Sequence, residues 1–333
     1  MNTRDYRFDN IKGIMIFLVV FCHLIEKFQL DYLNIALTKH LYFAVYSFHM
    51  PVFIFISGYF AGKSKGDRRY KSLTRYLIPY LVVNTAYDVF YTLSTKSLVF
   101  NPFYPRWILW FLLSMFFWHV FIDYIKLIRY PVVVAILLGL LAGWFNDIGY
   151  FLSLSRTICF FPFFVAGYYT QSNKAILEPK RRTRLIIITL FIVVQVIIFI
   201  MAQKNVIINT FYLSLSYDEM RQPIAFRMLY RLIVYAAGFI GTLFFLSVIP
   251  NEKTFLSEIG RYSITVYLAH QLIIVVLNHF FTGFSSPVVT LPAAAVLSVL
   301  ICLAFGNKYI NKLYQAIFDR INRFLIPTPQ TFR

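Results

Sequence analysis

Long apolar runs separated by short polar segments make up most of the chain. An α-helix needs about 20 mostly apolar residues to cross a lipid bilayer. Ten runs approach that length and predict an all-α protein, a polytopic transmembrane helical bundle of about ten spanning helices in residues 1–306. The expected spans cover residues 10–29, 40–62, 73–95, 107–126, 131–147, 153–171, 184–203, 225–249, 258–281 and 287–306.

The pattern changes after residue 306. Apolar residues then recur at every fourth position among basic ones, which is typical of an amphipathic helix lying on a membrane surface. We therefore expect residues 307–333 to form a cytoplasmic, basic, amphipathic tail. The positions that carry this pattern are Leu313, Ile317, Ile321 and Leu325 on the apolar side and Lys312, Arg320 and Arg323 on the basic side.

Composition supports a membrane protein, because 59% of the 333 residues are hydrophobic and only 14% are charged. A net charge of +18 could indicate a nucleic-acid partner. The basic residues, however, lie in short clusters between the apolar runs, which favours loops beside anionic lipid and no nucleic acid. With a cytoplasmic N-terminus and ten helices, 21 Lys and Arg residues fall inside and 6 outside. This bias predicts a multi-pass protein of the cytoplasmic membrane with both termini cytoplasmic.

Motifs of soluble enzymes and metal sites are absent from the sequence. The three cysteines lie inside apolar runs without metal-ligand spacing, and no HExxH, Walker, GxSxG or GxGxxG pattern occurs. The longest hydrophilic stretch, about residues 203–224, is too short for a separate catalytic domain. We therefore expect no metal, and any chemistry must use residues within the bundle or at its ends.

Ionisable side chains at membrane depth are costly and are functional candidates. Lys12 and His23 are eleven residues apart on one expected helix, which places them within about 20° of the same face and roughly 16 Å apart. Glu26 follows His23 by one turn. The lysine could hold a phosphate, and the histidine with its carboxylate could act as a general base. The structural alternative is a snorkelling lysine and a histidine hydrogen-bonded between helices.

Other polar residues have similar alternatives. His49 lies at a depth close to His23 on the returning second helix, or it is only a polar group before Pro51. The basic loop between Lys63 and Arg75 could bind a polyanionic cofactor, or it could only anchor the membrane orientation. Arg156 suits either a substrate contact or an interhelical pair with Asp88 or Glu26.

Taken together, these segments resemble the membrane-bound acyltransferase-3 family, and within it the group described as fucose 4-O-acetylase-like. The matching pieces stand in chain order across nearly the whole sequence. They are Phe8-Asp9-Asn10-Ile11-Lys12-Gly13 with His23, Ser47-Phe48-His49-Met50-Pro51 with Ser57-Gly58, Arg75-Tyr76-Leu77-Ile78-Pro79-Tyr80, Trp110-Phe111-Leu112, Arg156 with Phe161-Pro162-Phe163-Phe164, and Gly260-Arg261-Tyr262-Ser263 with His270.

The resemblance implies transfer of an acyl group, usually acetyl, from cytoplasmic acetyl-CoA to a sugar hydroxyl. The acceptor would be a surface glycan or a lipid-linked sugar precursor. Lys12 fills a basic position where many members carry arginine, and Ser72 stands where the first of two arginines is expected, with Lys71 beside it. The implied cofactor-binding residues are Lys12, Arg75, Lys71 and Arg69, and the implied substrate-binding residues are Arg156, Arg261 and His270.

His23 would then deprotonate the acceptor hydroxyl or accept the acyl group first. Glu26 could orient His23, and His49 could polarise the thioester carbonyl or share the proton. The resemblance leaves open direct transfer or an acyl-histidine, and acetyl or succinyl. A bundle with buried charges also suits a transporter of polysaccharide or small solutes without acyl-transfer activity.

Overall fold

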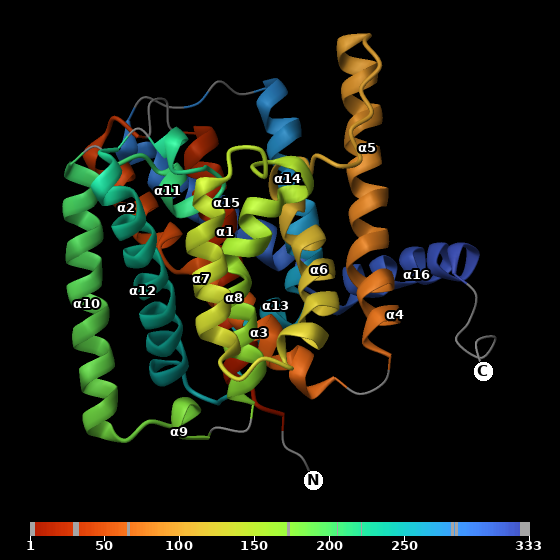
Figure 1. The fold of residues 1–333 in the computed structure, drawn as a ribbon. Coiled ribbons are helices and arrows are strands. Elements are labelled where there is room, and N and C mark those ends of the chain that lie inside the picture. The colour runs from red at the N-terminus through yellow and green to blue at the C-terminus, as the bar shows by residue number, and fades with distance from the viewer. Residues whose placement is uncertain are drawn as a thin grey trace. The chain divides into compact units, whose positions relative to one another are not determined.

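The computed structural model describes residues 4–28, 33–64, 67–171, 174–204, 206–220, 222–280, 283 and 286–326. Lys65 of the basic loop, Arg221 and the end of the tail lie outside the described residues. Within the described part the regular structure is entirely helical, which confirms the predicted fold class. Figure 1 shows the helices α1 Arg7–Phe28, α2 Ala36–Tyr46, α3 His49–Lys63, α4 Arg68–Ser72, α5 Ile78–Thr95, α6 Trp110–Ile125, α7 Pro131–Leu141, α8 Leu154–Thr170, α9 Lys174–Leu177, α10 Arg181–Gln203, α11 Asn209–Tyr212, α12 Ile224–Val248, α13 Phe255–Arg261, α14 Ser263–Phe280, α15 Pro287–Phe305 and α16 Lys308–Leu325.

Fewer of these helices qualify as spans than the sequence predicted. Seven segments of the described chain are long and apolar enough to cross a bilayer: Arg7–Phe28, Ala36–Lys63, Trp107–Ile125, Phe151–Thr170, Arg181–Gln203, Ala225–Val248 and Pro287–Phe305. An eighth is possible if α13 and α14, which are bent by 77°, form one broken span. The prediction of a single helix over 258–281 was therefore wrong at this bend, and the count of ten is not confirmed.

The two remaining apolar runs form helices that fail the same test for identifiable reasons. The α7 helix and the turn after it end at Trp144, so this segment is shorter than a bilayer crossing requires. The α5 helix is long enough, but it carries Asn84 and Asp88 along with several hydroxyl side chains, which lower its hydropathy. Both helices exist where the apolar pattern predicted them, and only their crossing of the membrane is not established.

The chain divides into two compact units. The first contains residues 1–56, 172–211 and 233–314, and in it α1 packs against α13, α14 and α15 while α2 packs against α10 (Figure 1). The second contains residues 57–171, 212–232 and 315–333, and in it α8 packs against α6 and α7. Each unit carries a different group of the predicted site residues.

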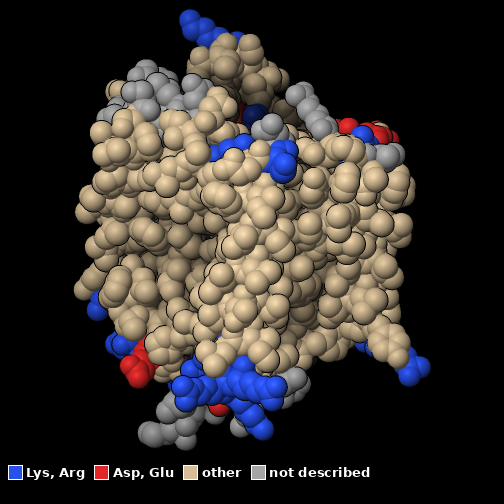
Figure 2. Space-filling view, turned by 90° about the vertical axis from the view of Figure 1, so that its left-hand side faces the viewer, with Lys and Arg blue, Asp and Glu red and all other residues tan. Residues whose placement is uncertain are grey.

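One face of the protein has the surface that lipid requires. Along α10, the side chains of Leu185, Ile192, Val196, Phe199 and Ile200 are each at least half exposed. Figure 2 looks onto the side where α10 runs and shows Lys and Arg gathered at the ends of this face, with mostly uncharged residues between them. Such an apolar surface on a long helix is stable only against hydrocarbon, so the protein is a multi-pass membrane protein.

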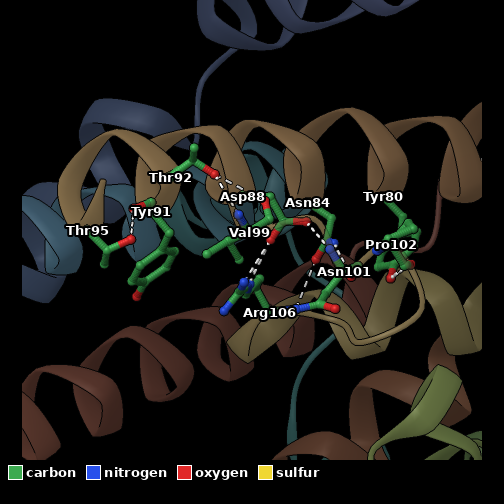
Figure 3. A network of polar contacts seen from close by, with 10 residues as sticks. All are labelled: Tyr80, Asn84, Asp88, Tyr91, Thr92, Thr95, Val99, Asn101, Pro102 and Arg106. Carbon is green, nitrogen blue, oxygen red and sulfur yellow. Dashed lines mark hydrogen bonds and ion pairs between the residues drawn. The ribbon is translucent and has the colours of Figure 1, made fainter. Parts of the chain in front are cut away.

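A polar network in the second unit fastens α5 to the segment that follows it (Figure 3). Asp88 is 1% exposed and accepts hydrogen bonds from the Asn101 backbone N–H at 2.8 Å and from Arg106 Nε at 2.9 Å. Asn84 accepts from the Arg106 backbone N–H at 3.0 Å, and the Tyr80 hydroxyl donates to the Pro102 carbonyl at 2.6 Å. The polar groups that weaken α5 as a span are therefore paired with its own return loop.

Removing the carboxylate of this network should destabilise the protein. In Asp88→Ala, the Arg106 guanidinium loses its ion pair and the Asn101 N–H loses its acceptor, which costs about 3 kcal/mol or more for a buried pair. We expect a clearly lower thermal midpoint for the detergent-solubilised protein. Asp147→Ala, at an exposed position in the same unit, is the control and should unfold like the wild type. Equal midpoints for both variants would contradict this account of α5.

Candidate active site

The site in the first unit begins with a close contact between α1 and α13. A Cβ atom added at Gly260 would collide with the Asp9 carbonyl oxygen and with the Gly13 backbone nitrogen, and one added at Gly13 would collide with the Leu256 carbonyl. Both positions therefore allow the two helix backbones to approach more closely than any side chain would permit. The glycines fix how α13 and its neighbour α14 lie against α1.

The side chain of Asn10 fixes the same contact on its polar side. Its amide nitrogen donates to the carbonyls of Pro250 and Glu252 at 3.2 and 2.8 Å. Its oxygen accepts from the hydroxyls of Thr254 and Ser257 at 2.7 and 2.5 Å. All four hydrogen bonds open to an asparagine side chain are made, so the segment leading into α13 is tied to α1. Sequence reasoning quoted Asn10 only as part of a motif and did not assign it this role.

Lys12 lies on α1 beside this contact and does not stand alone. Its ammonium is 2.9 Å from one carboxylate oxygen of Asp9, and Arg4 pairs with the other oxygen at 2.6 Å. Arg261, at the end of α13, is near enough to interact electrostatically with Lys12. Two cations, Lys12 and Arg4, therefore contact one buried carboxylate, and the Asp9 carboxylate orients the ammonium of Lys12. Arg261 adds a third positive charge near Lys12. This excess of positive charge suits a phosphate group.

His23 lies farther along the same helix and pairs with His270 of α14. The distance between His23 Nδ1 and His270 Nε2 is 3.0 Å, and the two rings are nearly parallel. His270 Nδ1 is 3.1 Å from the Val266 carbonyl oxygen, which can only accept, so this nitrogen carries the proton. In a neutral pair, His270 Nε2 is then the acceptor and His23 Nδ1 the donor. The remaining nitrogen, His23 Nε2, is then unprotonated, and it forms no hydrogen bond within the described part of the chain.

This arrangement defines what His23 can do chemically. A histidine whose Nδ1 proton is held by an acceptor presents Nε2 as a base or a nucleophile, as in catalytic pairs where the second group sets the tautomer. The orienting group is His270, which the sequence reasoning placed among the substrate-binding residues. His270 is fully buried, so its ring is held by packing as well as by the Val266 carbonyl.

His49 is the third histidine of this group. It is 3% exposed, and its electrostatic interaction with His23 indicates that the two rings are close. Its Nδ1 lies 2.9 Å from the Val45 carbonyl and must donate to it, which leaves Nε2 as an acceptor in the neutral ring. A neutral His49 can therefore accept a proton but cannot polarise a carbonyl. The polarising role suggested from sequence requires a protonated ring.

Glu26 is bonded elsewhere than the sequence suggested. The Tyr42 hydroxyl donates to its carboxylate at 3.1 Å, and the hydroxyls of Tyr42 and Tyr46 are 2.8 Å apart. Since Tyr42 has one proton, Tyr46 donates to Tyr42. The rings of Tyr46 and His49 are in turn in T-shaped contact. Glu26 thus bonds to tyrosine hydroxyls on α2 that lead toward His49. His23 is oriented by its hydrogen bond with His270 instead.

The second unit holds the other predicted cofactor residues. Arg75 lies exposed in a π-helical turn, Leu73–Leu77, between α4 and α5, and it interacts electrostatically with the buried His119. Lys71 donates to the Ser64 hydroxyl at 3.0 Å, and the exposed Arg69 lies in the first turn of α4. Single π-helical turns are rare and are frequent at functional sites. Sequence periodicity gave no sign of this one.

Two further arginines of this unit, Arg68 and Arg156, have contacts that the sequence did not predict. Arg68, which sequence reasoning did not single out, pairs with Asp123 at 2.6 Å and helps hold α4 against α6. The guanidinium of Arg156 lies over the rings of Trp110 and Tyr150, at 5.2 and 5.3 Å from their centroids. Cation–π contacts of this kind hold an arginine at the edge of an aromatic cluster.

The structure thus divides the predicted residues into groups. In the first unit, Lys12 and Arg261 form one group with Asp9. His23, His270 and His49 form a second group, and Glu26 joins the tyrosines of α2. In the second unit, the basic residues Arg69, Lys71 and Arg75 lie on α4 and the π-helical turn, and Arg156 lies on α8.

Comparison with known proteins defines the class of this site. Residues 5–307 match the acyltransferase domain called Acyl_transf_3. The match includes α1 with Lys12 and His23, and it extends to α14 and α15. The chain therefore belongs to the acyltransferase-3 family and is an acyltransferase.

Part of the chain is also similar to a curated protein. A segment of the chain is 35% identical over 94 residues to the nodulation protein NolL of Sinorhizobium fredii (strain NBRC 101917 / NGR234). The matched segment covers 26% of this chain and 26% of that relative, so only about a quarter of its length is compared. No solved structure matches the chain.

The contact between α1 and α13 makes a direct prediction. In Gly260→Ala the added methyl group meets backbone atoms, so α13 must move away from α1, at a cost of about 2 kcal/mol or more. We expect a lower thermal midpoint and a lower yield of folded protein. Gly149→Ala is the control, because the nearest atom to its new Cβ would be the Ser214 carbonyl oxygen at an ordinary 3.8 Å. Unchanged stability in Gly260→Ala would show that the close approach is not needed.

Proposed function

We propose that the protein transfers an acetyl group from cytoplasmic acetyl-CoA to a hydroxyl of a cell-surface polysaccharide or of its lipid-linked precursor. The observation that carries this proposal is the histidine pair, in which the Val266 carbonyl and His270 leave the Nε2 lone pair of His23 available. Membership of the acyltransferase-3 family supports a reaction of this class. The fucose 4-O-acetylase-like group and acetyl as the acyl group remain predictions.

The donor would bind by its phosphates near Lys12. The ammonium of Lys12 is oriented by Asp9, and Arg261 adds positive charge nearby. Along the continuous helix α1, eleven residues separate Lys12 from His23, a rise of roughly 16 Å. The pantetheine arm of coenzyme A has a comparable reach, so phosphates held at Lys12 would bring the thioester toward His23. Arg75, Lys71 and Arg69 remain predicted contacts for the same cofactor, and Arg156 for the acceptor.

In the proposed direct transfer, Nε2 of His23 takes the proton of the acceptor hydroxyl as its oxygen attacks the thioester carbonyl. The tetrahedral intermediate then expels the thiolate of coenzyme A, which receives the proton from the His23 imidazolium. His270 stabilises that imidazolium by accepting its Nδ1 proton in a hydrogen bond. The same lone pair could instead attack the thioester and form an acyl-histidine, which the acceptor hydroxyl would then cleave.

The proposed orientation places both termini in the cytoplasm and the protein in the cytoplasmic membrane. The charge bias of 21 to 6 assumed that the helices α5 and α7 cross the bilayer. If neither crosses, Lys96 and Arg106 change places with Lys126 and Arg129, and the totals stay the same. The orientation argument therefore needs an even number of crossings rather than ten, provided that the α13–α14 pair counts as one.

A transporter without acyl-transfer activity was the alternative from sequence. Buried charges between helices suit both functions, but the family match and the oriented His23 favour transfer chemistry. A transporter would not need the lone pair of His23, and acetyl-CoA would have no effect on it.

Replacement of His23 tests the reaction. We expect His23→Ala to abolish acetylation of the glycan, measured by mass spectrometry in a deletion strain that carries the variant. His270→Gln should retain part of the activity, because a positioning residue sets the tautomer without performing the proton transfer. His40→Ala, which removes a ring bonded to Gln203, is the control and should acetylate normally. Normal acetylation by well-expressed His23→Ala protein would refute the mechanism.

Replacement of Lys12 tests the donor site. In Lys12→Met one charged contact to a phosphate is lost, so we expect the KM for acetyl-CoA to rise about tenfold or more while kcat changes little. Lys12→Arg should restore most of the affinity, because it keeps the charge beside Asp9. A fall in kcat at constant KM would contradict a role in donor binding and would place Lys12 in the chemical step.

A further inference from the structure

The amphipathic helix α16, the C-terminal helix in Figure 1, presents three different faces, as the exposure of its side chains shows. One face packs against the protein through Phe318 and Asn322, which are both 9% exposed. A second face is apolar and open, with Leu313 57%, Ile317 48% and Phe324 88% exposed. On the helical wheel, Lys308, Lys312, Asp319 and Arg323 lie away from both of these faces. An apolar face beside a basic face is typical of helices that lie in the membrane interface.

The position of α16 along the chain fits that reading. The candidate span α15 ends at Phe305, and α16 begins at Lys308 after only two connecting residues. A helix that starts where a span leaves the hydrocarbon lies at the depth of the lipid headgroups. The positive charges of α16 outnumber its one acidic residue, Asp319, and therefore complement an anionic leaflet.

The protein-facing side of α16 contacts the turn that carries Arg75. The amide nitrogen of Asn322 donates to the Thr74 carbonyl at 3.4 Å, and both residues belong to the second unit. Thr74 precedes Arg75 inside the π-helical turn Leu73–Leu77. The amide oxygen of Asn322 is buried and has no hydrogen-bond partner among the described residues, so packing alone does not explain an asparagine at this position.

We propose that α16 docks on the anionic lipid of the inner leaflet and, through the contact of Asn322 with Thr74, holds the turn that presents Arg75. Lipid charge thereby regulates the conformation of this turn. The regulation should give a higher affinity for acetyl-CoA in an anionic bilayer, and this consequence alone rests on the proposed function. Docking and coupling are properties of the protein that do not require activity.

Docking is tested on the full chain in nanodiscs that contain lipid with brominated acyl chains. A polarity-sensitive fluorophore is attached at Ile317→Cys and, as the matched control, at Gln315→Cys on the exposed polar side of the same helix. Labelling is selective because Cys22, Cys159 and Cys302 are buried. We expect strong quenching at position 317, weak quenching at 315, and a loss of the difference when phosphatidylglycerol is replaced by phosphatidylcholine. Equal quenching at both positions in anionic nanodiscs would overturn docking.

Coupling is tested by the alkylation rate of Arg75→Cys in the same nanodiscs. We expect the rate to differ by about threefold or more between anionic and zwitterionic lipid, and Asn322→Leu to remove this dependence while position 317 stays quenched. Gln315→Ala is the control and should keep the dependence. A lipid response in Asn322→Leu equal to that of the parent would overturn the coupling.

The consequence for catalysis is measured separately. We expect the KM for acetyl-CoA to be about fivefold lower in anionic nanodiscs, since several basic side chains near a charged surface contribute to docking. A KM independent of lipid, in a protein that shows quenching and coupled alkylation, would overturn the regulatory consequence alone. Absence of acetyl-CoA-dependent activity in every lipid would refute the proposed function, while the quenching and alkylation results would still decide the inference.

Discussion

The structure depends on one constraint: inside a bilayer there is no water to satisfy a polar group, so each must find a partner within the protein. Burial inside the protein sets the same requirement for Asp88 and Asn84, which bond to the loop that follows α5, and for Asn10, which makes four hydrogen bonds to the segment that leads into α13 and to its first turn. Each of these three side chains thus fastens two parts of the chain together. The same need for a partner also determines the tautomer of the buried histidine pair.

The histidine pair shows how an imidazole can be held in one tautomer in such an environment. Enzymes in water commonly orient a catalytic histidine with a carboxylate, which must then remain ionised. In this protein His23 is oriented by a second histidine, and that histidine is oriented by the Val266 carbonyl. The chain of acceptors ends on a neutral backbone group, so no negative charge has to be buried beside the base. The tautomer is set without the desolvation cost of a carboxylate.

The sequence predicted features that lie within one helix better than features that join two. Lys12 and His23 share a face because α1 is continuous, and eleven residues return to nearly the same side of any α-helix. The partners of these residues were not predictable in this way. Asp9 was quoted only within a motif, and the pairing of His23 with His270 joins residues 247 apart in the chain. Helix spacing carries no information about such a contact.

The pairing of His23 with His270 follows from the close contact of two glycines. Gly13 and Gly260 bring the backbones of α1 and α13 together, and the 77° bend then directs α14 along α1. His23 follows Gly13 by ten residues, and His270 follows Gly260 by ten residues. The chain segments from Gly13 to His23 and from Gly260 to His270 thus start at the same helix contact and have the same length. Their far ends also lie together, because His23 and His270 are hydrogen-bonded. A packing contact without any polar side chain of its own therefore determines where His23 meets His270, and it also brings Arg261 to Lys12.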